Sequence, residues 1–166
     1  MSKEQINMKR RGFVAKLFGV VAIPIMADAA PGGEASKVAK IQKTEADWKK
    51  ILTREQFSVL RDEDTERAFT SALNAEKRKG VYQCAGCDLP LFSSDMKFDS
   101  GTGWPSFFTT LPGAFETKVD NTFFSRRTEY HCARCDGHHG HVFDDGPKPT
   151  GQRWCNNGVA LKFVPA

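Results

Sequence analysis

The stretches Cys84-Ala85-Gly86-Cys87 and Cys132-Ala133-Arg134-Cys135 decide the architecture, because both have the C-x-x-C spacing of a metal-binding turn. Such a turn presents two thiolates at tetrahedral angles to one metal ion, and Gly86 relaxes the backbone of the first turn. The 44 residues between the pairs mean that one metal would join distant parts of the chain. We expect a structural zinc ion (Zn2+) on all four cysteines, since four thiolates leave no open position for a substrate.

Two other interpretations of these four thiols stay open. Iron also accepts thiolate ligands, so the residue types alone do not select zinc. In an exported protein the two pairs would instead form disulfides, unless a metal were captured first.

Cys155 is the one cysteine outside the two pairs, in the string Arg153-Trp154-Cys155-Asn156-Asn157. Residues two apart on a strand point to one face, so Arg153, Cys155 and Asn157 would lie together. The arginine favours the thiolate that attacks electrophiles, and the asparagine would orient a substrate or a water molecule. A buried core position is the commoner role of a cysteine, but these polar neighbours favour a nucleophile.

Histidines and an aromatic loop supply further candidate groups. The string Gly137-His138-His139-Gly140-His141 offers imidazoles that deliver protons near neutral pH, although each one alone would also suit a solvated or metal-binding role. Trp104 follows a glycine-rich turn and precedes a proline, which restricts it to extended geometry. Its ring would either line an apolar pocket or fill the core.

The composition indicates one folded domain after a basic leader. The 166 residues suffice for one hydrophobic core, and the 13 phenylalanines predict that this core is aromatic. Residues 1–29 hold five of the 24 Lys and Arg but two of the 20 Asp and Glu, so the remainder is close to neutral. We therefore expect no nucleic-acid partner.

Residues 1–29 have the build of an export signal. Lys9-Arg10-Arg11 precede an apolar run, and Ala27-Asp28-Ala29 offers a small-x-small cleavage site. The paired arginines resemble a twin-arginine signal, which implies the twin-arginine export machinery as a partner and an exported, periplasmic protein. A general secretory signal and an uncleaved basic tail are the alternatives. A pathway for folded proteins would let the four thiols bind metal before export.

Residues 30–43 are small and polar and predict a flexible linker, and residues 44–166 hold the domain. Thr44 and Thr53 begin capping-box patterns, so we expect two short helices, with a third near Glu66–Leu73. From residue 80 on, short apolar runs alternate with turn residues, which is an α+β, mainly β pattern with antiparallel strands. The expected strands are Gly80–Cys84, Pro90–Phe92, Gly113–Thr117, Thr122–Phe124, Arg127–Cys132, His141–Phe143, Arg153–Cys155 and Val159–Val164.

Over residues 44–165 the chain resembles the B-type methionine sulfoxide reductases, through five strings in the order and spacing of that family. These are Gly80–Cys87, Ser100–Phe107, Cys132–Cys135, His138–Phe143 and Gly151–Phe163. The resemblance implies two antiparallel sheets with short N-terminal helices, and structural zinc on the four paired cysteines. It also implies thiol-dependent reduction of methionine-R-sulfoxide, free or in proteins and peptides, to methionine.

The resemblance also gives the candidate residues roles. Cys155 is similar to the family's nucleophile, which attacks the sulfoxide sulfur and becomes a sulfenic acid. His138 and His141 match its active-site histidines, one of which protonates the sulfoxide oxygen or holds the water that does. The remaining matches are Asn157, Arg153 and Trp104, the last being the ring that receives the substrate methyl group.

The chain departs from the family pattern at three positions. Thr102 stands where many members have a second, resolving cysteine, so Cys155 lacks a partner for an internal disulfide. We expect a thioredoxin-like protein or a small thiol to reduce the sulfenic acid instead. His139 replaces a commonly apolar residue and Gly158 a common serine, and neither change removes a reacting group.

Two other functions remain for this pattern. A non-catalytic zinc-stabilised binding module would explain the paired cysteines, but not Cys155, Trp104 and the histidines. A thiol peroxidase or disulfide exchanger would use Cys155 without preference for one sulfoxide epimer.

Overall fold

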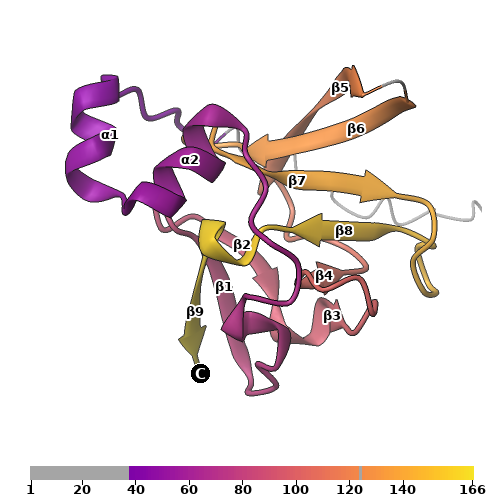
Figure 1. The fold of residues 1–166 in the computed structure, drawn as a ribbon. Helices are drawn as coiled ribbons and strands as arrows, with labels where there is room; N and C mark the ends of the chain where they lie inside the picture. Colours follow the sequence, from indigo (N-terminus) through magenta and orange to yellow (C-terminus); the bar gives the residue numbers. More distant parts are fainter. Residues whose placement is uncertain (1–37, 124) are drawn as a thin grey trace, which may run out of the picture. The chain divides into compact units, whose positions relative to one another are not determined.

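The computed structural model describes residues 38–123 and 125–166, which form an α+β fold that is mainly β, as expected (Figure 1). The predicted export signal and most of the predicted linker lie outside the described residues. The helices are α1 (Glu45–Ile51) and α2 (Arg54–Asp62), with 3-10 turns η1 (Ala72–Asn74), η2 (Ser94–Met96) and η3 (Gly158–Ala160). The strands are β1 (Gly80–Cys84), β2 (Pro90–Ser93), β3 (Lys97–Phe98), β4 (Ser106–Phe107), β5 (Phe115–Phe123), β6 (Ser125–Cys132), β7 (His138–Phe143), β8 (Arg153–Asn156) and β9 (Leu161–Pro165).

Both predicted N-terminal helices are present, and each begins after the threonine that the sequence indicated. Thr44 caps α1 by accepting a backbone N–H of the first turn, and Thr53 forms a full capping box with Gln56 in α2. α2 lies beside β7 and η3 and buries Val59 and Leu60. Among the described residues, no helix has the length and hydropathy needed to cross a membrane.

The predicted third helix near Glu66–Leu73 is wrong. Residues 63–71, called the strap below, are irregular, and helical turns begin only at η1. The carboxylate of Glu66 accepts hydrogen bonds from the backbone N–H groups of Gly158 and Val159, and the N–H of Glu66 donates to Asn157. Hydrogen bonds to a distant segment thus replace the ones that a helix would have made.

The strands form two antiparallel sheets, which confirms the expected fold class. One sheet has the order β2-β1-β9, and the other has the order β3-β4-β8-β7-β6-β5. The strands predicted at Gly113–Thr117 and Thr122–Phe124 belong largely to one strand, β5. Asp120 and Asn121 are typical turn residues, but an irregularity in the pairing with β6 between Asp120 and Phe123 accommodates them.

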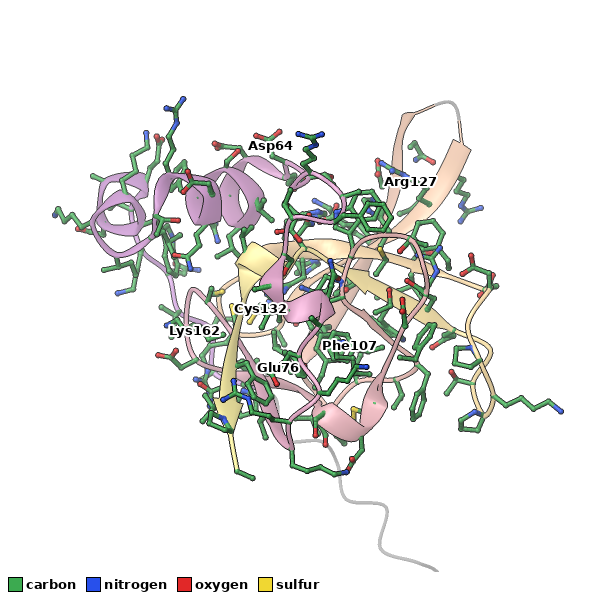
Figure 2. All side chains as sticks on the ribbon, turned by 60° about the horizontal axis from the view of Figure 1, so that its bottom comes forward. Asp64, Glu76, Phe107, Arg127, Cys132 and Lys162 are labelled. Atoms are coloured by element: carbon green, nitrogen blue, oxygen red, sulfur yellow. The ribbon has the colours of Figure 1, made fainter. Side chains whose placement is uncertain are left out.

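Aromatic rings join the two sheets, as the phenylalanine content predicted. Phe107 of β4 stacks on Phe92 of β2, with ring centroids 3.8 Å apart and planes 6° apart. Tyr82 of β1 packs edge-on against Phe107 at 5.0 Å, and Phe115 of β5 lies 5.1 Å from Phe92. Phe107 (labelled in Figure 2), Tyr82 and Phe92 are fully buried, so both sheets share one core.

The six-stranded sheet separates a core face from a polar face, because side chains alternate along each strand. On β8, Trp154 packs against the core ring of Tyr130, and Cys155 therefore points to the other face. Cys155 stands opposite His141 of β7 on one side and Ser106 of β4 on the other. Glu129 of β6 is in turn the partner of His141. The strand order shown in Figure 1 thus gathers polar residues of four strands on one face.

Candidate active site and metal centre

Four of the five cysteines form a four-cysteine cluster at the ends of β1 and β6 and in the turns that follow. The Sγ atoms of Cys84 and Cys135 are 3.6 Å apart, those of Cys87 and Cys132 are 3.5 Å apart, and all four lie within 4.8 Å of one another. A disulfide needs about 2.05 Å, whereas two thiolates on one tetrahedral zinc ion lie about 3.8 Å apart. The four sulfurs are free thiols in a geometry that fits zinc, and sulfur atoms gather beside Cys132 in Figure 2.

The two C-x-x-C turns repeat one backbone geometry. The residue after each pair, Asp88 or Asp136, has a positive φ and donates its N–H to the carbonyl of the first cysteine, at 2.9 or 3.0 Å. Aspartate adopts this left-handed conformation more readily than most residues. Arg61 of α2 donates a further hydrogen bond to the carbonyl of Cys135 at 2.8 Å. Local turns and one helix therefore position the four thiols.

Cys155 lies apart from this cluster and lines a pocket of about 140 Å³, together with Trp104, His141 and Asn157. Pockets for drug-sized ligands usually measure about 300–1,000 Å³, so this one suits a single small side chain. Gly140 lets β7 and β8 approach closely, since a Cβ atom there would lie 2.0 Å from the carbonyl oxygen of Cys155. The pocket therefore opens where the nucleophile candidate and a candidate proton donor are cross-strand neighbours.

Burial and polar neighbours act in opposite directions on Cys155. Burial raises the pKa of the thiol above its ordinary value, while the charge of Arg153 and a hydrogen bond with Thr102 lower it. Asp145 holds Arg153 by two hydrogen bonds at 2.8 and 2.9 Å, and the guanidinium lies 4.3 Å from the ring centre of Phe143. The predicted proximity of Arg153 and Cys155 is confirmed. Its charge does not outweigh burial, so the resting sulfur is a thiol.

The two candidate histidines each pair with a carboxylate. Nε2 of His141 lies 2.8 Å from Oδ2 of Asp120, and Nδ1 of His138 lies 2.9 Å from Oε1 of Glu129. The two imidazole centroids are 5.6 Å apart, and of the two residues His141 lines the pocket. Burial lowers the pKa of His141, against the hydrogen bond with Asp120, so the ring is neutral near pH 7. Its Nε2–H then donates to the carboxylate, which leaves the lone pair on Nδ1.

Trp104 and Asn157 are both tied to the strap. The indole N–H of Trp104 donates to the carbonyl of Glu66 at 3.0 Å, which orients the ring in the pocket wall. The side chain of Asn157 accepts a hydrogen bond from the N–H of Glu66 at 3.0 Å and donates one to the carbonyl of His139 at 3.0 Å. Both polar atoms of this amide thus have backbone partners, and the amide joins the strap to β7.

The residues that hold the site in place are those that sequence reasoning missed. The backbone of Glu66 bonds to the side chains of Trp104 and Asn157. Asp120 pairs with His141, and Glu129 pairs with His138. Arg127, labelled in Figure 2, lines the pocket and forms an ion pair with Asp120 at 2.6 Å. The alternation of side chains along β5 and β6 would place Asp120 and Glu129 on one face. No sequence motif distinguishes these two residues from the other acidic residues of the chain.

Comparisons with known proteins identify the family. The model of the SelR domain matches residues 52–165. A peptide methionine sulfoxide reductase MsrB of Methanosarcina mazei is 54% identical over 126 residues, which cover 75% of this chain and 90% of that protein. A protein of the same name from Agrobacterium fabrum is 52% identical over 127 residues, covering 76% and 94%. One from Pseudomonas putida is 52% identical over 128 residues, covering 76% and 96%.

The SelR match spans both C-x-x-C turns, the Trp104 loop, the histidines of β7 and Cys155. The earlier resemblance is therefore confirmed by independent similarity over most of the described residues. The chain belongs to the SelR-domain family of B-type methionine sulfoxide reductases.

Proposed function

We propose that this protein reduces methionine-R-sulfoxide to methionine and that Cys155 is its nucleophile. The observation that carries the proposal is the position of Cys155: the one thiol outside the four-cysteine cluster lines a small pocket together with Trp104 and His141. Relatives that are about half identical are named peptide methionine sulfoxide reductases, which supports oxidised methionine in proteins or peptides as the substrate.

The pocket offers three different contacts to a methyl sulfoxide. The indole of Trp104 is an apolar surface for the methyl group, Cys155 faces the sulfur, and His141 faces the oxygen. Because the sulfoxide sulfur is chiral, exchanging its substituents would bring the wrong group to each contact. Three distinct contacts therefore select one epimer.

The reaction transfers one oxygen atom from methionine sulfur to Cys155. The sulfur of Cys155 attacks the sulfoxide sulfur, while the thiol proton passes through Nδ1 of His141 to the sulfoxide oxygen. The attack forms an S–S bond and leaves a hydroxyl group on the substrate sulfur. This hydroxyl then moves to the Cys155 sulfur as the S–S bond and the S–O bond of the substrate break, so methionine leaves and Cys155 becomes a sulfenic acid. Methionine sulfur gains an electron pair and Cys155 sulfur loses one. The charge of Arg153 and the hydroxyl of Thr102 stabilise the attacking sulfur as it loses its proton.

An external thiol completes the cycle. A first thiol attacks the sulfenic acid of Cys155 to give a mixed disulfide and water, and a second thiol releases Cys155 and a reductant disulfide. Thr102, which neighbours Cys155, supplies no sulfur for an internal disulfide, and the other four cysteines are in the four-cysteine cluster. A thioredoxin-like protein or a small thiol therefore fits as the reductant.

We assign zinc to the four-cysteine cluster in a structural role. Four thiolates at these separations fill a tetrahedral shell, so the ion would join β1 to β6 and take no part in the chemistry at Cys155. The S···S distances of 3.5 and 3.6 Å support this assignment, because they match two ligands of one metal and exceed a disulfide bond.

We also propose export through the twin-arginine machinery to the periplasm, on the strength of Arg10-Arg11 and the apolar run that follows. In a bacterium with that pathway, the Arg10→Lys, Arg11→Lys double variant should stay inside the cell while the wild type is recovered from the periplasm. Normal export of the double variant would point to the general secretory route.

The central test assays each epimer of a methionine sulfoxide peptide with dithiothreitol, using the wild type and Cys155→Ser. We expect turnover of the R epimer alone and its loss in the variant, by at least about 1,000-fold. Equal turnover of both epimers, or activity that survives without the Cys155 sulfur, would refute the proposal.

A further inference from the structure

His139 is a fully buried polar residue that the proposed chemistry does not use. Its ring packs among core aromatics, with centroids 5.3 Å from Phe115 and 6.5 Å from Tyr130. Burying an imidazole in such surroundings is costly unless its nitrogens are hydrogen-bonded. The partners of His139 therefore indicate why an imidazole stands there.

The two nitrogens of His139 face two different sites. Nε2 lies 3.4 Å from Sγ of Cys84, a member of the four-cysteine cluster. Nδ1 lies 3.2 Å from Oδ1 of Asn156, which follows Cys155 on β8. The carbonyl of His139 also accepts the backbone N–H of Asn157 at 2.8 Å. One side chain thus stands between the cluster and the strand that carries the nucleophile.

The nitrogen that carries the hydrogen of the His139 ring determines which of the two contacts is a hydrogen bond donated by the ring. A neutral imidazole has one N–H, and Asn156 presents an oxygen to it: Oδ1 accepts from the hydroxyl of Tyr130 at 3.0 Å, while Nδ2 donates to the carbonyl of Asn157 at 2.7 Å. A metal-bound Cys84 is a thiolate, and a charged acceptor makes a stronger hydrogen bond than an amide oxygen. Hydrogen on Nε2 is therefore favoured when metal is bound, and the contact of Nδ1 with Oδ1 of Asn156 is then not a hydrogen bond.

We propose that His139 donates its Nε2–H to the metal-bound thiolate of Cys84, and so strengthens metal binding. Groups that hydrogen-bond a metal ligand typically change metal affinity by about 10–100-fold. This inference rests on the metal occupancy proposed above, but its readout is metal retention and is independent of sulfoxide turnover.

Three substitutions separate the two contacts. His139→Gln places an amide donor near the position of Nε2, within reach of Cys84. The shorter side chain of His139→Asn reaches only toward Asn156. His139→Leu keeps a similar side-chain volume but removes both polar contacts. His131→Leu is the matched control, because His131 adjoins Cys132 in sequence but lies 3.6 Å from the exposed carboxylate of Glu116. The experiment measures the rate at which each purified, zinc-loaded protein transfers its metal to a chromogenic chelator.

We expect His139→Leu and His139→Asn to release zinc about tenfold faster than wild type, and His139→Gln and His131→Leu to stay within about twofold of it. Release from His139→Leu at the wild-type rate, or from His139→Gln as fast as from His139→Leu, overturns the inference. If the variants fail to fold, ¹⁵N signals of the His139 ring in zinc-loaded wild type decide: hydrogen on Nε2 supports the inference, and a bare Nε2 refutes it.

The experiment also distinguishes this inference from the proposed function. A wild-type protein that is purified reduced and binds no zinc refutes the metal site, and the role of His139 with it. Normal zinc content with unchanged release refutes only the role of His139.

Discussion

The five cysteines of this protein work in two contrasting surroundings. In the four-cysteine cluster each thiol lies against other thiols, and Cys84 and Cys132 are buried. Cys155 instead lines a pocket, beside the charge of Arg153 and the hydroxyl of Thr102. The contrast teaches that neighbours, more than residue type, decide whether a sulfur holds a metal or attacks a substrate.

The two regions also differ in what positions them. The cluster forms at strand ends and turns, where a metal ion would close the gap between two sheets. Cys155 lies on a strand that is paired on both sides within the larger sheet. Changes in the cluster should therefore act mainly on stability, and changes around Cys155 mainly on reactivity.

The largest effect should come from Cys87→Ser, which removes one metal ligand. Structural zinc contributes on the order of 10 kcal/mol to folding in small zinc domains, comparable to the whole stability of a domain. We expect loss of bound zinc and of cooperative thermal unfolding, measured by metal analysis and circular dichroism. Cys155→Ser is the control and should keep its bound zinc and its cooperative thermal unfolding. If Cys87→Ser unfolds at the same temperature as the wild type, the cluster does not determine stability and the proposed difference between the two regions is wrong.

The next effect should come from Glu66→Ala, which acts on the pocket through the strap. The substitution leaves the N–H groups of Gly158 and Val159 without their carboxylate acceptor, so the free energy of unfolding should fall by about 2 kcal/mol. KM should rise, because the carboxylate anchors the backbone of Glu66, whose carbonyl and N–H hold Trp104 and Asn157. Urea unfolding and steady-state kinetics measure the two effects.

Glu63→Ala provides the matched control for Glu66→Ala. Glu63 is also in the strap, but its exposed carboxylate pairs with Lys118, and such a pair contributes at most about 1 kcal/mol. Equal losses in the two variants would show that the strap contributes by its charge and not by its hydrogen bonds.

A smaller effect should follow from Arg153→Met, measured as the rate at which iodoacetamide alkylates Cys155 across pH. Burial raises the pKa of the Cys155 thiol and the charge of Arg153 lowers it, so removing the charge raises the pKa further. Less thiolate is then present at any pH below the pKa, and alkylation at pH 7 should slow about fivefold. The pH profile of alkylation should move to higher pH in Arg153→Met and stay in place in Arg78→Met, the control at an exposed arginine. An unchanged profile in Arg153→Met would show that the charge of Arg153 does not affect the pKa of Cys155.

The smallest effect on rate should come from Thr102→Cys, which sharpens the comparison by adding a sixth thiol beside Cys155. Because the Thr102 hydroxyl lies close enough to Cys155 to lower its pKa, a sulfur there should attack the sulfenic acid and form a disulfide with loss of water. Turnover with dithiothreitol should change by less than about threefold. Peptide mapping without reductant should find the new disulfide in the variant and a sulfenic acid or mixed disulfide in wild type; an internal disulfide to Cys155 in wild type would contradict the external reductant.

Local sequence patterns predicted the parts of the fold that have local causes. Thr44 and Thr53 begin helices because each caps residues within one turn of itself. The strap escaped prediction because Glu66 bonds to residues that lie more than 90 positions away. The continuity of β5 escaped it as well, since the irregularity at Asp120 shows only in the pairing with β6.

The site shows the same division between local and distant causes. Cys155, His141 and Trp104 stand in short motifs, so the sequence alone singled them out, and the structure brings them to one pocket. Glu129 is singled out only by the strand register, which sets it beside His141 and which no local pattern specifies. Asn157 was noticed for its type, but the partners of its amide required the folded chain.

The pairing of β1 with β9 sets a condition on biosynthesis. Gly80 lies opposite Pro165, so the central strand of the smaller sheet waits for a partner made near the end of the described chain. Until β9 leaves the ribosome, Tyr82 lacks its contact with Phe163, and the nascent chain exposes apolar surface. The smaller sheet is thus completed only after all the other described strands have been made.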